Sequence, residues 1–70
     1  MFKPGTLVKL AAGYEQYMGW STAEHGNEFW INRSHVGMFL GMHYDNVNVR
    51  ILIGDQIVVV YPKAIEKYQG

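Results

Sequence analysis

Three histidines have the widest chemical range of any side chains in this chain, because imidazole binds metals and transfers protons near neutral pH. His25, His35 and His43 lie in separate segments and lack the His-x-x-x-His spacing that places two imidazoles on one helix face. The chain also contains no cysteine, which removes thiolate ligands and disulfides. We therefore interpret the histidines as scattered surface or rim residues and expect neither a metal nor a cofactor.

The hydroxyl and carboxyl side chains form no recognisable catalytic group. Ser21, Thr22 and Ser34 stand outside any Gly-x-Ser-x-Gly context, and the six Asp and Glu residues form no evident pair. Neither a P-loop nor a Gly-x-Gly-x-x-Gly pattern is present. The sequence therefore favours a binding module over an enzyme.

Aromatic residues gather in the segment 14–30, which contains Tyr14, Tyr17, Trp20, Phe29 and Trp30. Rings in a long loop can bind an extended or Pro-rich peptide, and the candidate residues for this are Tyr17, Trp20 and Trp30. The alternative is that the rings fold back as a lid over a core too small to close alone. The short chain favours the lid.

Composition limits the partners that this chain could bind. Hydrophobic residues make up 49% of the 70 residues and charged residues 17%, less than the roughly 25% of typical globular domains. Six basic residues balance six acidic ones, so there is no basic excess to attract nucleic acid. No apolar run approaches the roughly 20 residues that cross a bilayer. We expect a cytoplasmic protein that associates with copies of itself or with a protein or peptide partner, with RNA less favoured and no membrane contact.

The elements that must position these residues read as short strands. Apolar periodicity predicts strands over 6–10, 28–32, 36–43, 47–53 and 57–61, with a short closing strand near 65–68. The pattern "STAE" at 21–24 predicts one helical turn within an otherwise irregular segment 14–35. We predict one all-β domain over 1–70, a five-stranded barrel with a long loop after the first strand. The expected core is Leu7, Val8 or Leu10, Val36, Met38, Leu40, Val47, Val49, Ile51, Ile53, Val58, Val60 and Ile65.

The stretch "VNVRILIGDQIVVVYP" at 47–62 predicts a hairpin that is apolar on both faces. Gly54-Asp55 suits a two-residue type II′ turn, which sets Leu52 opposite Ile57 and Arg50 opposite Val59. One face is then the core, and the other carries Leu52, Ile57, Val59 and Tyr61. An exposed apolar patch of this kind marks an interface. We expect these four residues to meet another subunit, and the alternative is that the segment 14–30 covers them.

The order of these elements resembles an SH3-like barrel: a strand, a long loop, three hairpin-connected strands, a turn and a short last strand. The layout is similar to that of the very short uncharacterised SH3-like proteins of bacteriophages and marine viruses. Those proteins open with a strand like "KPGTLVKL" at 3–10 and close with one like "IEKY" at 65–68. This resemblance implies the fold and, for a viral protein, the host cytoplasm, but no known activity.

The segment "ILIGDQIVVV" at 51–60 also resembles the second motif of Sm-like proteins, ring-forming RNA binders of the same barrel class. "YDNVN" at 44–48 is similar to part of their first motif, although the Asp-to-Asn spacing is one residue short and Ile53 stands where that family has Arg. The resemblance implies a ring and base-binding positions at His43 or Tyr44, Asp45, Asn48, Gly54 and Asp55.

Overall fold

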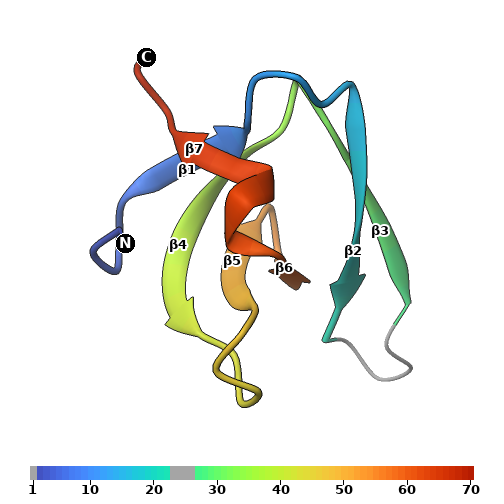
Figure 1. Cartoon of the computed structure of the whole chain (residues 1–70), viewed down its shortest axis with the longest axis vertical. Coiled ribbons are helices and arrows are strands. Elements are labelled where there is room, and N and C mark those ends of the chain that lie inside the picture. The colour runs from blue at the N-terminus through green and yellow to red at the C-terminus, as the bar shows by residue number, and fades with distance from the viewer. Residues whose placement is uncertain (1, 23–26) are drawn as a thin grey trace.

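The computed structural model describes residues 2–22 and 27–70, and it is built from β-strands joined by turns (Figure 1). The strands are β1 (Leu7–Leu10), β2 (Gln16–Ser21), β3 (Glu28–Asn32), β4 (Val36–Met42), β5 (Val49–Ile53), β6 (Gln56–Val60) and β7 (Ile65–Lys67). A 3-10 turn, η1 (Pro62–Ala64), connects β6 to β7.

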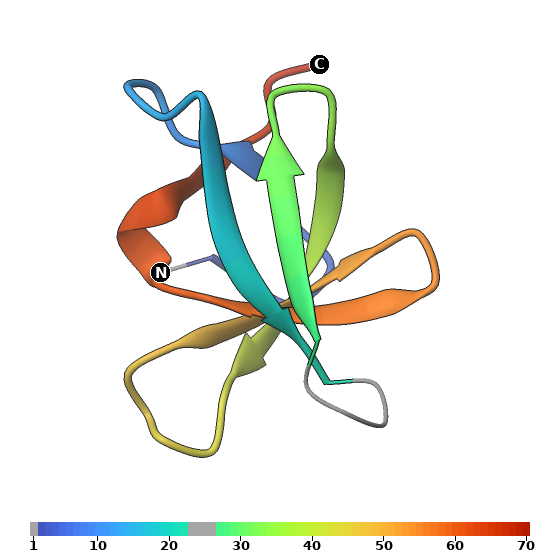
Figure 2. The same ribbon diagram turned by 90° about the vertical axis from the view of Figure 1, so that its right-hand side faces the viewer.

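The strands form one antiparallel sheet whose neighbour order is β3-β2-β6-β5-β4-β1-β7. The sheet curls into a half-barrel, with β1 and β7 on one side and the β2–β3 hairpin standing on the other (Figures 1 and 2). The predicted all-β class is confirmed. The described residues form seven strands, however, and not the five that were predicted.

The segment 14–35 contains the β2–β3 hairpin. The strand predicted over 28–32 is confirmed as β3, whereas the prediction that the rest of the segment is irregular is wrong, because β2 occupies 16–21. Its paired residues alternate between the two faces, but each face mixes polar with aromatic residues. The polarity contrast on which periodicity depends is therefore missing from β2. The helical turn predicted over 21–24 lies mostly outside the described residues, and Ser21 itself ends β2.

Gly19 allows β2 to approach β6 closely. A Cβ at this position would lie 2.7 Å from Cγ1 of Val58 and 2.9 Å from the backbone oxygen of Val59. Any larger residue would therefore push the two strands apart. The pairing that results, Trp20 with Val59 and Ser21 with Val58, joins the hairpin to the rest of the sheet.

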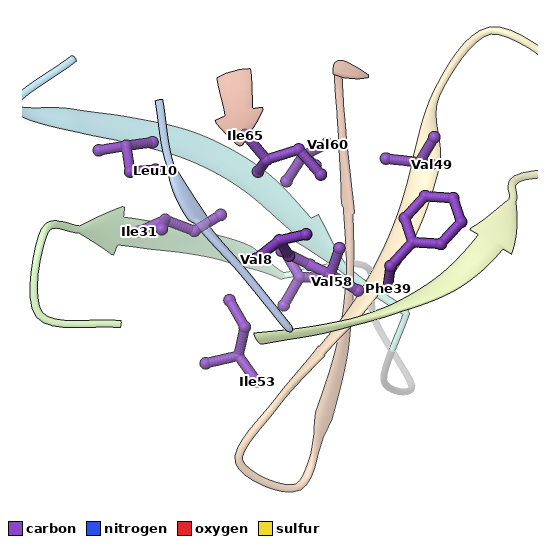
Figure 3. Close-up of a cluster of buried hydrophobic side chains, with 10 residues drawn as sticks. Val8, Leu10, Ile31, Phe39, Val49, Ile53, Val58, Val60 and Ile65 are labelled. Atoms are coloured by element: carbon purple, nitrogen blue, oxygen red, sulfur yellow. The ribbon is translucent and has the colours of Figure 1, made fainter. Parts of the chain in front are cut away.

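The core lies on the concave side of the curled sheet (Figure 3). It consists of Val8, Leu10, Ile31, Phe39, Val49, Ile51, Ile53, Val58, Val60 and Ile65. The prediction is confirmed for β5, β6 and Ile65, and both Val8 and Leu10 are buried where one of them was expected. Ile31 and Phe39 were not predicted. Leu7 and Val47 were predicted and are wrong, with 45% and 55% of their surface exposed.

The predicted inward face of β4 is also wrong, because the strand has the opposite phase. Val36 and Met38 are each 38% exposed and Leu40 is half-buried, whereas Gly37 and Phe39 face the core. A Cβ at Gly37 would lie 3.0 Å from Cγ1 of Ile53, so a glycine is needed where β5 packs most closely. Apolar residues occupy both faces of β4, and alternation alone could not choose between them.

The β5–β6 hairpin has the predicted register. Leu52 pairs with Ile57, Arg50 pairs with Val59 and Val49 pairs with Val60. Gly54 has a φ of 62° and Asp55 has no positive φ, as a type II′ turn requires. Val49, Ile51 and Ile53 accordingly face the core, and Leu52 lies on the convex side.

Candidate functional site

An apolar row crosses four strands on the convex side of the sheet. Leu7 on β1 pairs with Met38 on β4, Met38 pairs with Leu52 on β5, and Leu52 pairs with Ile57 on β6. Directly paired residues of antiparallel strands place their side chains on the same face, so these four side chains are successive neighbours. We call them the outer row. Leu7 and Met38 are 45% and 38% exposed, and Leu52 and Ile57 are half-buried.

The outer row contains two of the four residues predicted as a subunit interface, Leu52 and Ile57. The other two, Val59 and Tyr61, differ sharply in exposure. Val59 lies between its partners Arg50 and Trp20 and is only 8% exposed, whereas Tyr61 follows β6 and is 44% exposed. The segment 14–30 therefore does meet the hairpin, but it does so by pairing β2 with the edge of β6. Leu52 lies beyond this pairing, whereas Ile57 lies at its end, where the Ile57 carbonyl accepts hydrogen bonds from the Thr22 N–H at 2.8 Å and from the Thr22 hydroxyl at 3.3 Å.

The three aromatic residues predicted to bind a peptide do not share one surface. Tyr17 pairs with the core residue Ile31 and packs against the core, while Trp20 and Trp30 lie on the other face of the hairpin. The Tyr17 hydroxyl oxygen also accepts a hydrogen bond from the backbone N–H of Tyr61 at 3.4 Å. A peptide lying on Trp20 and Trp30 would therefore not reach Tyr17 from the same side.

Tyrosine residues gather instead where the hairpin meets η1, an arrangement that the sequence did not reveal. The rings of Tyr14 and Tyr17 meet edge to face, with centroids 5.8 Å apart, and the Tyr17 hydroxyl binds the backbone of Tyr61. Arg33 donates from Nη1 to the Tyr14 carbonyl at 2.9 Å, which fixes the start of the hairpin. Tyr14 is 37% exposed and Tyr61 44% exposed. The one sign of this arrangement in the sequence is Tyr61, which directly precedes Pro62, the first residue of η1.

Asp45 organises the β4–β5 loop. One of its carboxylate oxygens accepts hydrogen bonds from the backbone N–H groups of Val47 and Asn48, both at 2.9 Å, and the other accepts from the Asn48 side chain at 2.7 Å. These bonds stabilise the charged carboxylate, and those of the Asn48 and Val47 backbones lower the pKa of Asp45 most. Asp45 and Asn48, two predicted base-binding residues, thus bind each other.

Tyr44 projects from the same loop with 85% of its surface exposed. The Arg50 guanidinium carbon lies 5.7 Å from the centre of the Tyr44 ring, and the His43 ring lies 4.8 Å from it. The exposed ring has a face on which a planar ligand could stack, with a cation beside it.

The remaining residues of the predicted base-binding set lie elsewhere. Asn48 precedes β5, whereas Gly54 and Asp55 follow it in the β5–β6 turn. The two loops therefore lie at opposite ends of a five-residue strand, separated by roughly 16 Å at the usual rise per residue (Figure 2). The structure does not bring the predicted set together within one chain.

Other kinds of site are not formed by the part of the chain that the structure describes. Within residues 2–22 and 27–70 there is no cluster of three or more potential metal-binding side chains and no enclosed pocket. None of the described segments is a helix with the length and apolarity that a membrane span requires.

Comparison with known proteins adds no assignment, since no protein-family model, curated protein or solved structure matches the chain.

Proposed function

We propose that this protein is a non-enzymatic binding module that joins copies of itself through the outer row. The observation that carries the proposal is the continuity of that row over four neighbouring strands. The face of a sheet that is exposed to water usually carries polar side chains. A line of four apolar side chains across neighbouring strands is instead typical of a face that meets a partner. Balanced charge removes a barrier to self-contact, since copies with no net charge do not repel each other.

We further propose that the module is an SH3-like barrel. In this interpretation the barrel strands are β1, β4, β5, β6 and β7, and the β2–β3 hairpin elaborates the loop after the first strand. Three features support it: β4, β5 and β6 are joined by successive hairpins, a 3-10 turn precedes the last strand, and β1 pairs with both β4 and β7. This layout is also what resembles the small SH3-like proteins of phages and marine viruses.

Sedimentation of the purified protein over a concentration series tests self-association. We expect a mass above that of the 8.0 kDa chain, and at least tenfold weaker association for Leu52→Lys, because the new charge would lie at the centre of the row. Val47→Lys is the matched control, since Val47 is already 55% exposed and lies outside the row. A wild-type protein that stays monomeric at tens of micromolar would overturn the proposal.

A second candidate function, single-stranded RNA binding by an Sm-like ring, is favoured by one observation, the exposed Tyr44 ring beside Arg50. Exposed aromatic rings stack on bases, and a nearby cation contacts phosphate. This candidate predicts that uridine- or adenine-rich oligonucleotides raise fluorescence anisotropy at low salt, and that Tyr44→Ala or Asn48→Ala weakens binding. An unchanged anisotropy at low salt removes it.

A further inference from the structure

The sheet has two edges, β3 and β7, and they differ in how well they are protected against pairing with another chain. β7 has three residues and ends in Lys67, and short length and lysine are common protections of an edge strand. β3 has five residues, "EFWIN", with neither proline nor lysine. It is therefore the edge more open to a further strand.

One hydrogen bond shows which backbone N–H and C=O groups of β3 face β2 and which face the free edge. The Ser21 N–H donates to the Asn27 carbonyl at 2.7 Å, so hydrogen-bonded pairs recur at every second residue of the β2–β3 ladder. The backbones of Phe29 and Ile31 therefore face β2, and those of Glu28, Trp30 and Asn32 face the free edge.

Asn32 is already occupied at this edge. Its N–H donates to Nδ1 of His35 at 3.0 Å, and its carbonyl accepts from the His35 N–H at 3.1 Å. The N–H and C=O groups of Glu28 and Trp30 remain, and within residues 2–22 and 27–70 the structure gives these four groups no partner.

We propose that β3 pairs with β3 of a second copy of this chain, antiparallel and about a two-fold axis at Phe29. Glu28 of each copy then lies opposite Trp30 of the other, and four hydrogen bonds use all four free groups of both strands. A two-fold axis at Trp30 would set Glu28 against Asn32 of the second copy, whose groups already bind His35. The local hydrogen bonding thus favours the axis at Phe29 over the axis at Trp30.

Side chains beside the edge supply apolar area for this contact. Trp20 pairs with Glu28 across the hairpin and Trp30 lies two residues along, with 51% and 54% of their surfaces exposed. In the proposed register, Trp30 of one copy lies next to Glu28 of the other, with Trp20 of that copy on its far side. Large indole rings each bury about 150–250 Å² when fully covered, so the contact falls at the small end of specific interfaces. We expect a micromolar, concentration-dependent dimer.

This edge contact goes beyond the outer row, because it lies on a different part of the sheet and requires none of its residues. Each contact is self-complementary. Two different two-fold contacts on one subunit build assemblies larger than a dimer, whereas either one alone stops at a dimer. The test is therefore made in the Leu52→Lys background, where the outer row is disabled. In this background only the edge contact can join two copies, so its dissociation constant can be measured alone. A failure of the edge contact is then distinguished from a failure of the outer row.

Replacing Trp30 tests the edge directly. Trp30→Pro removes the outward N–H and leaves the bonds to β2 intact, because proline is tolerated where an edge N–H faces away from the sheet. Trp30→Val removes the same indole and keeps the N–H. By sedimentation, we expect Trp30→Val to weaken the dimer a few-fold and Trp30→Pro to weaken it at least tenfold further. Equal weakening by the two variants, or no dimer before mutation, would overturn the proposal.

Amide hydrogen exchange on the Leu52→Lys protein supplies the same test without a proline. The Glu28 and Trp30 amides face solvent in a monomer and are bonded in the proposed dimer. Their exchange should slow about fivefold between roughly 10 and 500 μM protein, because the fraction of monomer in a micromolar dimer falls at most with the square root of concentration. The Phe29 amide, already bonded to β2, should change less. Exchange at Glu28 and Trp30 that is independent of concentration contradicts the edge contact, even if Trp30→Pro fails to fold.

Discussion

The β5 strand and the β3 strand are both five residues long, yet they are held in opposite ways. β5 has a paired strand on each side and buries Val49, Ile51 and Ile53 on one face. β3 has a paired strand on one side only and fully buries Ile31 alone. A strand with two neighbours and a regular apolar face is stabilised by backbone and core together. A strand at the edge depends on its hairpin partner, and its free groups are available to another chain.

The largest expected effect is a difference between two core truncations. Ile51→Ala and Ile31→Ala remove the same atoms from side chains that are each 2% exposed. Ile51→Ala should cost about 4 kcal/mol and Ile31→Ala about 2 kcal/mol, because the edge hairpin can relax into the space left behind. Urea unfolding measures both. A cost for Ile31→Ala equal to that for Ile51→Ala would break the comparison.

Two glycines test how each region is attached. Gly19→Ala forces a methyl group against Val58 and the Val59 carbonyl, and Gly37→Ala forces one against Ile53 and the Leu52 carbonyl. Each should cost about 1–3 kcal/mol. In Gly19→Ala, amide exchange should quicken in β2 and β3 only, whereas in Gly37→Ala it should quicken across β1, β4 and β5. Faster exchange across all of these strands in both variants would show that the hairpin and the rest of the sheet open as one unit.

The loop that leads into β5 should show a dependence on pH. The Asn48 and Val47 backbones lower the folded-state pKa of Asp45, so this carboxylate contributes stability above its unfolded pKa of about 3.9. That contribution is lost as pH falls through the lower folded-state pKa. An NMR titration of the carboxyl carbon should place the Asp45 midpoint below 3.9, and Asp45→Asn should remove this part of the acid dependence of the melting temperature. A midpoint near 3.9 contradicts the hydrogen bonds assigned to Asp45.

The smallest expected effect concerns the contact between the hairpin and η1. Tyr17→Phe removes the hydroxyl that accepts the Tyr61 N–H at 3.4 Å, a long and therefore weak hydrogen bond. The loss should be about 0.5 kcal/mol, measured by urea unfolding. Tyr14→Phe is the control, because it is a neighbouring ring that keeps the edge-to-face contact. A cost above about 2 kcal/mol would mean that this bond, and not the Trp20–Val59 pairing, attaches the hairpin.

The same contrast explains how much of the fold could be predicted. In the β5–β6 hairpin the turn residues and the alternation of apolar residues indicate the same register. That register and the inward face could therefore be predicted from Gly54 and the apolar period. In β4 both faces are apolar, and only the close packing at Gly37, a property of the assembled sheet, selects the inward one. In β2 the inward residues include Gly19 and Ser21, which carry no hydrophobic signal although both are buried.

The candidate sites follow the same division. Leu52 and Ile57 were predictable because they belong to the regular hairpin, whereas their continuation through Met38 and Leu7 depends on pairing between distant segments. Tyr17 looked equivalent to Trp20 and Trp30 in the sequence. Only the hairpin register places it on the other face.

Sedimentation equilibrium of the wild-type protein beside Leu52→Lys tests self-association most directly. Self-association through the outer row predicts a mass that rises above 8.0 kDa with concentration for the wild type and a smaller rise for Leu52→Lys, with Val47→Lys unchanged from wild type. A single 8.0 kDa species at every concentration for all three proteins would contradict it.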